Sequence, residues 1–269
     1  MQRGGAKVTI VKLMGLDKSR KRALVTGASE GIGRVFCLAL HSRGYAITGV
    51  ARSESRLQSL KSELKNDPDS LMITADLSTE SGVRSVEAEL VRQKYDILVN
   101  NAGFGLLGRF EDVAFSEYEK MIRLNIIALT ALSHTFLKTA KSGDGLINVA
   151  STLAFLGMPI QSVYSATKAY VTSLTESLWF AGREKGVKVV NLCPGITASQ
   201  FNIRAGGKPE DLPALLTQQP EAVVREALNQ FDGCCGPTRV TGFPNRLGVF
   251  FTRLLPRSWV VIMMGKSRQ

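Results

Sequence analysis

The chain has 269 residues, 44% hydrophobic and 21% charged, and this length and composition predict one large α/β domain with a substantial core. The composition argues against a disordered chain, and no apolar stretch approaches the ~20 residues that a membrane-spanning helix requires. The formal net charge of +11 and the pI of about 9.7 suit a phosphate-rich ligand, an anionic membrane surface or nucleic acid, without choosing among them.

The basic residues are scattered except for a cluster near the amino terminus, formed by Lys18, Arg20, Lys21 and Arg22. No nucleic-acid-binding motif accompanies this cluster, so we expect a solvated leader or surface strand there and no nucleic-acid partner. Residues 1–21 are interpreted as a basic extension, because they lack the apolar core and the small-residue cleavage site of a signal peptide.

The cysteines and histidines indicate neither a metal site nor a disulfide framework. The four cysteines are Cys37, Cys193, Cys234 and Cys235. Without a C-x-x-C spacing, reduced thiols in a cytoplasmic protein are the simplest interpretation. His41 and His134 stand in helical patterns with no metal-ligand spacing, and we expect ordinary surface or core histidines.

From residue 22 onward, short β-branched runs alternate with longer amphipathic stretches. The predicted strands cover residues 22–28, 45–52, 71–77, 96–103, 145–151 and 187–195, with a weaker one at 239–243. The predicted helices lie near residues 31–43, 53–65, 79–94, 116–141, 162–185 and 219–231. Gly44 and Gly186 fall where helices should end. This alternation predicts a doubly wound (Rossmann) parallel sheet flanked by helices, in a single domain over residues 22–244.

Three glycines follow the first predicted strand in the stretch TGASEGIG, at Gly27, Gly31 and Gly33. Glycine permits a tight turn there and lets backbone amides and the positive end of a helix approach a pyrophosphate closely. The spacing is a variant of the dinucleotide-binding fingerprint. A glycine-rich turn without a ligand is the alternative for this motif alone.

The second predicted strand ends in GVARSE, where a dinucleotide-binding fold places the group that meets the adenosine ribose. Arg52 offers charge and hydrogen-bond donors to a 2′-phosphate, whereas an aspartate there would accept from a free 2′-hydroxyl. NADP(H) is therefore favoured over NAD(H). Glu54 nearby would moderate this preference, and a merely solvated Arg52 is the alternative.

Polar side chains follow three further predicted strands: Asp76 in ADLS, Asn100 and Asn101 in NNAG, and Ser151 in VAST. Each alone fits an ordinary turn or cap, but together they mark successive carboxyl ends of strands, where a ligand cleft is expected. Asn125 stands among apolar residues of a predicted helix. It is either a satisfied structural asparagine or part of a polar network at the cleft.

Tyr164 and Lys168 are the two ends of the stretch YSATK, and their spacing of four places them one helical turn apart on the same face. A solvated pair is the alternative for this short motif alone. A free tyrosine has a pKa of ~10. Positive charge on Lys168 and on an oxidised nicotinamide would favour the phenolate and lower that pKa.

Taken together, these motifs resemble the short-chain dehydrogenase/reductase family in order and separation over roughly residues 22–200. The stretches that carry the resemblance are TGASEGIG, NNAG, Asn125, Ser151, YSATK and the pair Pro194 and Gly195. The branch it resembles is that of DltE-like oxidoreductases, long-chain ketoacyl reductases and hydroxysteroid dehydrogenases. The carboxyl end lacks the glycine-rich closing strand common in 3-oxoacyl-acyl-carrier-protein reductases.

The resemblance implies a catalytic tetrad of Asn125, Ser151, Tyr164 and Lys168. Tyr164 would exchange a proton with the substrate oxygen, and Ser151 would stabilise the charge on that oxygen. Lys168 would also hold the nicotinamide ribose, and Asn125 would anchor a water of the proton relay. The residues expected to contact the cofactor are Gly27, Ser29, Gly31, Ile32, Gly33, Arg52, Asp76, Leu77, Asn101, Ala102, Gly103, Tyr164, Lys168, Pro194, Gly195 and Thr197.

These features predict an NADP(H)-dependent oxidoreductase that interconverts a ketone or aldehyde and an alcohol, and that works on a lipophilic carbonyl as a reductase. A catalytically silent NADP(H)-binding sensor and a basic membrane-associated scaffold are the alternatives. Residues 196–218 are expected to form a substrate lid. We also expect a homodimer or homotetramer through the helices of Asn125 and Tyr164. The apolar positions that support it are Val171, Leu174, Leu178 and Trp179.

Residues 245–269 interleave large apolar groups with Arg246, Arg253, Arg257 and Lys266. A helical face would gather Leu247, Phe250, Phe251 and Leu254, before Pro256 breaks the pattern and a second apolar run begins at Trp259. We expect this segment to cover the core, the substrate pocket or a subunit contact of the enzyme. The alternative is a basic amphipathic surface that makes weak, peripheral contact with a membrane.

Overall fold

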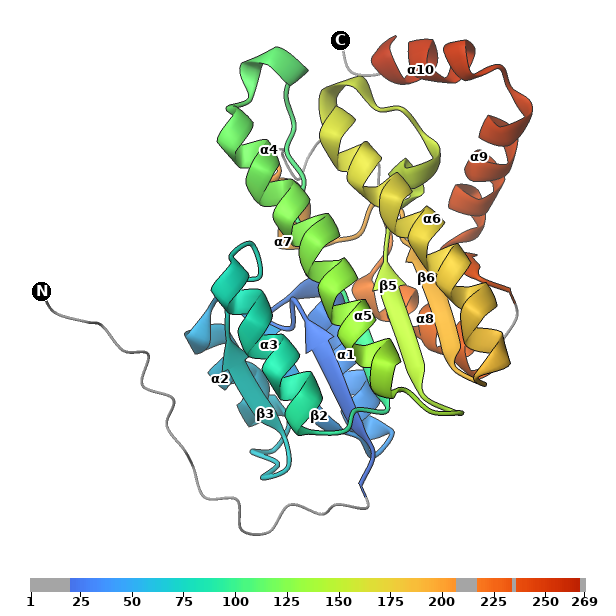
Figure 1. The fold of residues 1–269 in the computed structure, drawn as a ribbon. Helices are drawn as coiled ribbons and strands as arrows, with labels where there is room; N and C mark the ends of the chain where they lie inside the picture. The colour runs from blue at the N-terminus through green and yellow to red at the C-terminus, as the bar shows by residue number, and fades with distance from the viewer. Residues whose placement is uncertain (1–19, 207–216, 234–235, 267–269) are drawn as a thin grey trace, which may run out of the picture.

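The computed structural model describes residues 20–206, 217–233 and 236–266, and it forms a parallel sheet with helices on both faces (Figure 1). The sheet has seven strands in the order β3-β2-β1-β4-β5-β6-β7, all parallel. The strands are β1 (Arg22–Thr26), β2 (Ala46–Ala51), β3 (Leu71–Thr74), β4 (Ile97–Asn100), β5 (Gly145–Val149), β6 (Lys188–Cys193) and β7 (Thr238–Val240). The predicted doubly wound architecture is confirmed.

The helices follow the strands as the periodicity predicts. They are α1 (Gly31–Ser42), α2 (Glu54–Glu63), α3 (Glu80–Arg92), α4 (Phe115–Ile122), α5 (Leu129–Thr139), α6 (Ser162–Glu184), α7 (Gln200–Arg204), α8 (Pro220–Gly233), α9 (Phe243–Leu254) and α10 (Arg257–Lys266). A π-helical segment, η2 (Arg123–Ala128), joins α4 to α5, and short 3₁₀ helices are η1 (Phe110–Asp112), η3 (Thr152–Phe155) and η4 (Pro159–Gln161). Gly44 and Gly186 have positive φ where α1 and α6 end, as expected.

Two apolar layers fill the space between the sheet and its helices. Side chains of β1 alternate between them: Ala23 and Val25 join the cluster under α1, α2 and α8, while Leu24 joins the one under α3 and α5. The central strands are buried throughout, but the edge strand β3 is partly exposed at Leu71. An edge strand has only one neighbouring strand, so β3 is less buried than the central strands. We had expected every strand to be buried on both faces.

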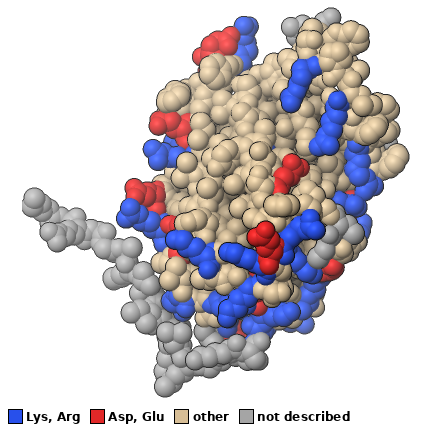
Figure 2. Space-filling view, turned by 45° about the vertical axis from the view of Figure 1, so that its right-hand side comes forward, with Lys and Arg blue, Asp and Glu red and all other residues tan. Residues whose placement is uncertain are grey.

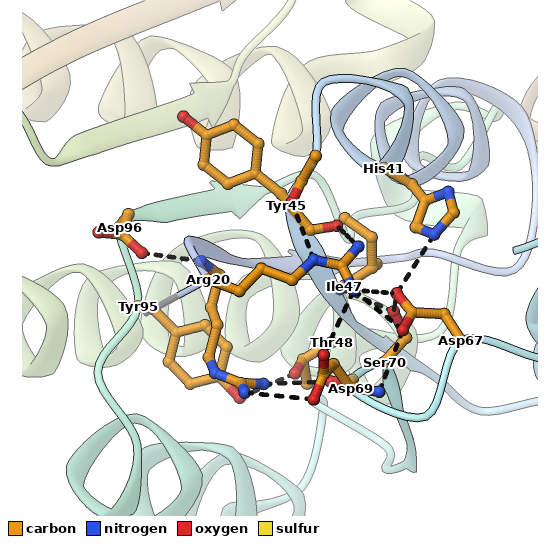
Figure 3. A network of polar contacts seen from close by, with 12 residues as sticks. Arg20, His41, Tyr45, Ile47, Thr48, Asp67, Asp69, Ser70, Tyr95 and Asp96 are labelled. Atoms are coloured by element: carbon orange, nitrogen blue, oxygen red, sulfur yellow. Dashed lines mark hydrogen bonds and ion pairs between the residues drawn. The ribbon is translucent and has the colours of Figure 1, made fainter. Parts of the chain in front are cut away.

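A polar network closes the amino ends of the strands, remote from the ligand-binding edge (Figure 3). Arg20 Nη1 donates to Asp67 Oδ1 at 3.0 Å. His41 Nε2 lies 3.2 Å from Asp67 Oδ2, so this histidine has a structural role. Arg22 is buried in β1 and its Nη1 donates to the carbonyl oxygen of Asp69 at 3.1 Å.

The expectation of a solvated amino-terminal cluster is therefore wrong for Arg20 and Arg22. Both arginines meet the turn before β3, because its aspartates supply the opposite charge and the hydrogen-bond acceptors that a buried guanidinium requires. Lys21 is exposed, as expected, and Lys18 lies outside the described residues together with the rest of residues 1–19.

The strand order reverses direction between β1 and β4, which are neighbours although two strands separate them along the chain. The crossovers leaving these strands run to opposite sides, so a crevice opens beyond their carboxyl ends. Asn101, just after β4, donates its amide to the carbonyl oxygen of Thr26 at 3.0 Å. This bond fixes the two strand ends relative to each other and defines one wall of the crevice.

Candidate active site

The glycine-rich turn between β1 and α1 has a backbone that only glycine adopts easily. Gly27 and Gly31 have φ of +67° and +52°. A Cβ added at Gly33 would lie 2.2 Å from the carbonyl oxygen of Gly27, so the start of α1 packs directly on the turn. The α1 amino terminus thereby faces the crevice with unpaired backbone N–H groups, an arrangement that fits a pyrophosphate.

A single cleft of about 1010 Å³ extends from this turn to the carboxyl-terminal helices. It is lined by nearly all of the residues predicted from the sequence to contact a cofactor: Gly27, Ser29, Gly31, Ile32, Arg52, Asp76, Leu77, Asn101, Ala102, Gly103, Tyr164, Lys168, Pro194, Gly195 and Thr197. Gly33 is the exception, because it lies buried behind the turn. The tertiary structure thus gathers residues from successive strand ends into one cavity, whose volume is at the upper end of the range for ligand pockets.

Tyr164 and Lys168 enter the cleft from the first two turns of α6. Both side chains are almost completely buried. Lys168 Nζ donates to the carbonyl oxygen of Val149 at 2.8 Å and lies 5.7 Å from the centre of the Tyr164 ring. Ser151, two residues beyond Val149, lines the same cleft and its hydroxyl oxygen accepts from the Leu153 N–H at 3.2 Å. The Ser151 hydroxyl also has a hydrogen bond with Tyr164, so these two side chains face each other in the cleft.

Burial dominates the protonation of this cluster. It raises the pKa of Tyr164 far above its ordinary value, while a hydrogen bond with Ser151 acts in the opposite direction. Burial also lowers the pKa of Lys168 to about 8. Lys168 is not among the groups that shift the pKa of Tyr164, so the lowering expected from this lysine is not found. The lowering expected from an oxidised nicotinamide stays a prediction. Tyr164 is a protonated phenol at neutral pH, which is the form that a proton donor needs.

Asn125 lies at the centre of the π-helical segment and has no solvent exposure. Its Oδ1 accepts from the Phe104 N–H at 3.1 Å, and its Nδ2 donates to the Phe104 carbonyl at 3.0 Å and to Thr167 Oγ1 at 3.1 Å. Asn125 does not line the cleft. It joins the loop after β4 to α6, beside Lys168, and a π-bulge is a common way to aim one side chain at a site.

The adenosine end of the cleft contains one acid and one unpaired cation. Asp76 accepts from the Ser78 hydroxyl at 2.7 Å. Burial raises the Asp76 pKa, but Ser78 and the charge of Arg52 more than compensate, so the net shift is downward. Arg52 is exposed and forms no ion pair within the described parts of the chain. Its guanidinium is free for an anionic ligand group.

Glu30 links three elements around the cleft in a way that the sequence did not predict. Arg56 Nη1 in α2 donates to Glu30 Oε2 at 2.5 Å, and Arg204 Nη2 in α7 donates to the same oxygen at 2.6 Å. Arg204 and Glu30 both line the cleft. The glutamate inside TGASEGIG was the available signal, but its partner lies 174 residues away and no periodicity connects them.

The far end of the cleft is apolar, and only the segments of Phe201 and Met264 were anticipated there from the sequence, as a substrate lid and a pocket cover. Its wall consists of Leu107, Leu153, Leu156, Met158, Phe201 and Met264. The Phe201 ring lies 5.6 Å from the Tyr164 ring, so this wall meets the cluster of Ser151, Tyr164 and Lys168 directly. These residues come from loops and short helices after the strands, which show no periodic pattern. Residues 207–216 of the predicted lid lie outside the described residues.

The described residues contain no cluster of histidine, cysteine and acidic side chains that could hold a metal ion. Cys37 and Cys193 are buried and free, while Cys234 and Cys235 are outside the described ranges. Among the described helices, none combines the length and apolarity required to cross a bilayer.

The doubly wound sheet, the glycine cradle and the tyrosine–lysine pair define a dinucleotide-dependent α/β oxidoreductase. A sequence model of the family described as short chain dehydrogenase matches residues 21–208, and the chain belongs to this family. It is an oxidoreductase of the class that acts on CH–OH groups with NAD(P) as acceptor.

Three relatives illustrate the family membership. An uncharacterized oxidoreductase of Staphylococcus aureus is 31% identical over 215 residues, which are 78% of this chain and 91% of the relative. The 7beta-hydroxysteroid dehydrogenase of Mediterraneibacter gnavus is 26% identical over 220 residues, 80% of this chain and 84% of that enzyme. A short-chain dehydrogenase from Sphingobium yanoikuyae in complex with NADPH has a TM-score of 0.77 at 27% identity, covering 87% of this chain and 93% of that one.

Proposed function

We propose that the chain is an NADP(H)-dependent reductase of a lipophilic ketone or aldehyde, with Tyr164 as the general acid. The observation that carries the proposal is that Ser151, Tyr164 and Lys168 line one cleft with the glycine cradle at one end and an apolar wall at the other. A silent NADP(H) sensor would not need a buried proton donor beside an apolar substrate wall. Turnover of any carbonyl with NADPH separates the two.

The nicotinamide cofactor supplies the hydride to the carbonyl carbon. Tyr164 gives its proton to the carbonyl oxygen, so that an alcohol forms and a tyrosinate is left behind. Ser151 donates a hydrogen bond to the same oxygen as its negative charge develops. The ammonium of Lys168 stabilises the tyrosinate, and solvent returns the proton. In the oxidative direction the same groups act in reverse.

Asn125 has a positioning role in this proposal. All of its described side-chain hydrogen bonds go to Phe104 and Thr167, so it holds the loop after β4 against the helix that carries Tyr164. The water-anchoring role that the family resemblance implies stays a prediction. Gly103 fits the same arrangement, because a Cβ there would lie 3.0 Å from Asn125 Oδ1.

We propose a preference for NADP(H), supported by the unpaired Arg52 at the adenosine end and by the NADPH bound to the Sphingobium yanoikuyae relative. Arg52→Asp should weaken NADPH relative to NADH by at least about tenfold, because a charged hydrogen bond contributes ~1.5–3 kcal/mol. Arg84→Asp in α3, outside the cleft, is the matched control. A wild-type preference for NADH in parallel fluorescence titrations would contradict the assignment.

The substrate class follows from the apolar wall and is consistent with the hydroxysteroid named for the relative from Mediterraneibacter gnavus. In NADPH-oxidation assays, kcat/KM should rise from small water-soluble carbonyls to ring-sized lipophilic ones. Phe201→Ala should remove about tenfold of that preference, since burying such a ring contributes ~1.5–3 kcal/mol. Ile203→Ala, in the same helix but outside the cleft, is the control. Equal rates across the series would exclude a lipophilic pocket.

We also propose an oligomer formed through α4, α5 and α6. Val171, named from the sequence as a contact, is instead in the core. The exposed large apolar residues of these helices and of η2 are Phe115, Ile122, Ile127, Tyr170 and Phe180. Sedimentation at micromolar concentration should give a dimer or tetramer, and a monomer would contradict this. The free, buried cysteines support our assignment to the cytoplasm, with any membrane contact peripheral.

A further inference from the structure

The two carboxyl-terminal helices expose most of their large apolar side chains. Along residues 243–265, the buried side chains are those of Val249 and Val260. The exposed apolar ones are Phe243, Leu247, Phe250, Phe251, Leu254, Leu255, Trp259, Val261, Ile262 and Met263. We expected this segment to cover the core, the substrate pocket or a subunit contact. Core coverage is limited to Val249 and Val260, whereas Met264 lines the cleft and a subunit contact stays a prediction. A contiguous apolar patch of this kind marks a site of interaction.

The charge on the same helices has one sign. Residues 243–266 contain Arg246, Arg253, Arg257 and Lys266 and no aspartate or glutamate. Arg257 is exposed and has no ion-pair partner among the residues that the structure describes. Figure 2 shows the upper right of the molecule, where these helices lie, as a mainly uncharged surface with blue side chains on it. The patch is therefore apolar and cationic together.

The inner side of these helices rests on the substrate end of the cleft. The Arg253 guanidinium lies 5.2 Å from the centre of the Phe155 ring in η3, and Gly265 approaches Pro159 in η4. Met264 lines the cleft itself. Helices α9 and α10, which Figure 1 shows at the right and top of the fold, thus carry the exposed patch and also contribute Met264 to the apolar wall of the cleft.

We infer that the outer face of α9 and α10 is a docking surface for an anionic lipid bilayer. A second copy of the chain is a poorer occupant, because neither helix contains an acidic residue that could pair Arg257 across a symmetric contact of this face with itself. The other cations of the helices include Arg246, which already pairs with Glu226 of α8 at 3.6 Å. Nucleic acid matches the charge but not the aliphatic side chains. The helices have 12 and 10 residues, so they lie in the interface instead of crossing it.

Docking in this orientation places the pocket mouth beside the acyl-chain boundary, from which a lipophilic carbonyl can enter without passing through water. This consequence for substrate delivery rests on the proposed function, whereas the docking itself does not. Binding and turnover are separate measurements, so failure of either one is distinguishable from failure of the other.

The test is co-sedimentation of the full chain with phosphatidylcholine vesicles and with vesicles that also contain phosphatidylserine. We expect binding to the anionic vesicles that falls with added salt, and little binding to the neutral ones. Arg257→Glu should weaken binding at least about fivefold. Trp259→Ala should weaken it about tenfold. Arg84→Glu, the same charge change on exposed α3, should leave it unchanged.

Retained NADPH binding and an unchanged thermal transition would show that each variant is folded. Recovery of folded wild-type protein in the supernatant with both lipids would overturn the inference. A second result would also overturn it. If the wild-type protein bound no vesicles, and Arg257→Glu and Trp259→Ala disrupted self-association in sedimentation, the partner at this surface would be a second copy of the chain. If Arg84→Glu lost as much lipid binding as Arg257→Glu, binding would depend only on the net charge of the protein. That result would also overturn the inference of a specific docking surface.

Discussion

Helices α6 and α9 differ from the usual pattern in which apolar side chains are buried and polar ones are exposed. The buried positions of α6 are mainly polar, among them Thr167, Lys168 and Thr175, whose side chains all form hydrogen bonds. In contrast, α9 buries only Val249 and leaves Phe250 and Phe251 outside. A buried polar side chain requires hydrogen-bond partners, whereas a group of large exposed apolar side chains indicates a site of interaction with another molecule. The inward face of α6 carries the proposed catalytic residues, and the outward face of α9 carries the proposed docking surface.

The largest effect is expected at the catalytic end of α6. Tyr164→Phe should lower NADPH-dependent reduction by ~10²- to 10⁴-fold, because it removes the general acid and leaves the cofactor cradle intact. Tyr170→Phe, six residues later on the exposed side of the same helix, should keep full activity. Retained NADPH binding in both variants checks the folding, and a loss of less than about tenfold in Tyr164→Phe would contradict its role.

The next effect concerns the polar interior of α6. Thr175 Oγ1 accepts from Asn148 Nδ2 at 3.0 Å, and neither residue is exposed. Thr175→Val keeps the shape but leaves that amide unpaired, so the free energy of unfolding should fall by ~1–3 kcal/mol in urea denaturation. Ser177→Ala on the exposed side of α6 should change it by less than ~0.5 kcal/mol. Equal values for the two variants would show that burial of the network is unimportant.

A pH dependence should follow from the buried amine. Because burial lowers the pKa of Lys168 to about 8, its charge is present below this pH and is lost above it. Tyr164, with its raised pKa, stays protonated over the same range. The kcat/KM for reduction should therefore be level at lower pH and decline by up to about tenfold per unit above pH 8. A profile that stays flat to pH 10 would show that the charge on Lys168 does not assist the reaction.

The smallest effect is expected on the exposed face of α9. Phe250→Ser should change the free energy of unfolding by less than ~0.5 kcal/mol, since its ring packs little against the fold. Val249→Ala, the adjacent buried position, should cost more than ~1 kcal/mol because it removes packed methyl groups. If Phe250→Ser is instead the more damaging change in thermal and urea unfolding, α9 belongs to the core and the comparison with α6 fails.

The sequence by itself determined the sheet, its flanking helices and most of the cleft. Periods of 2 and 3.6 residues are local properties, and polar residues at successive strand ends must meet wherever parallel strands share an edge. For this reason Ser151, Tyr164 and Lys168 were identifiable from short motifs, together with the glycines of the first turn.

Only the tertiary structure decided which partner each long-range group meets. Arg20 and Arg22 looked like solvated charges until the turn before β3 placed Asp67 and Asp69 beside them. The bonds from Arg56 and Arg204 to Glu30 and the apolar wall at Phe201 depend on how loops cross the strand ends, which no local period encodes. The outward orientation of α9 was equally undetermined, because an amphipathic helix specifies that one face is apolar without specifying whether the protein or another surface covers it.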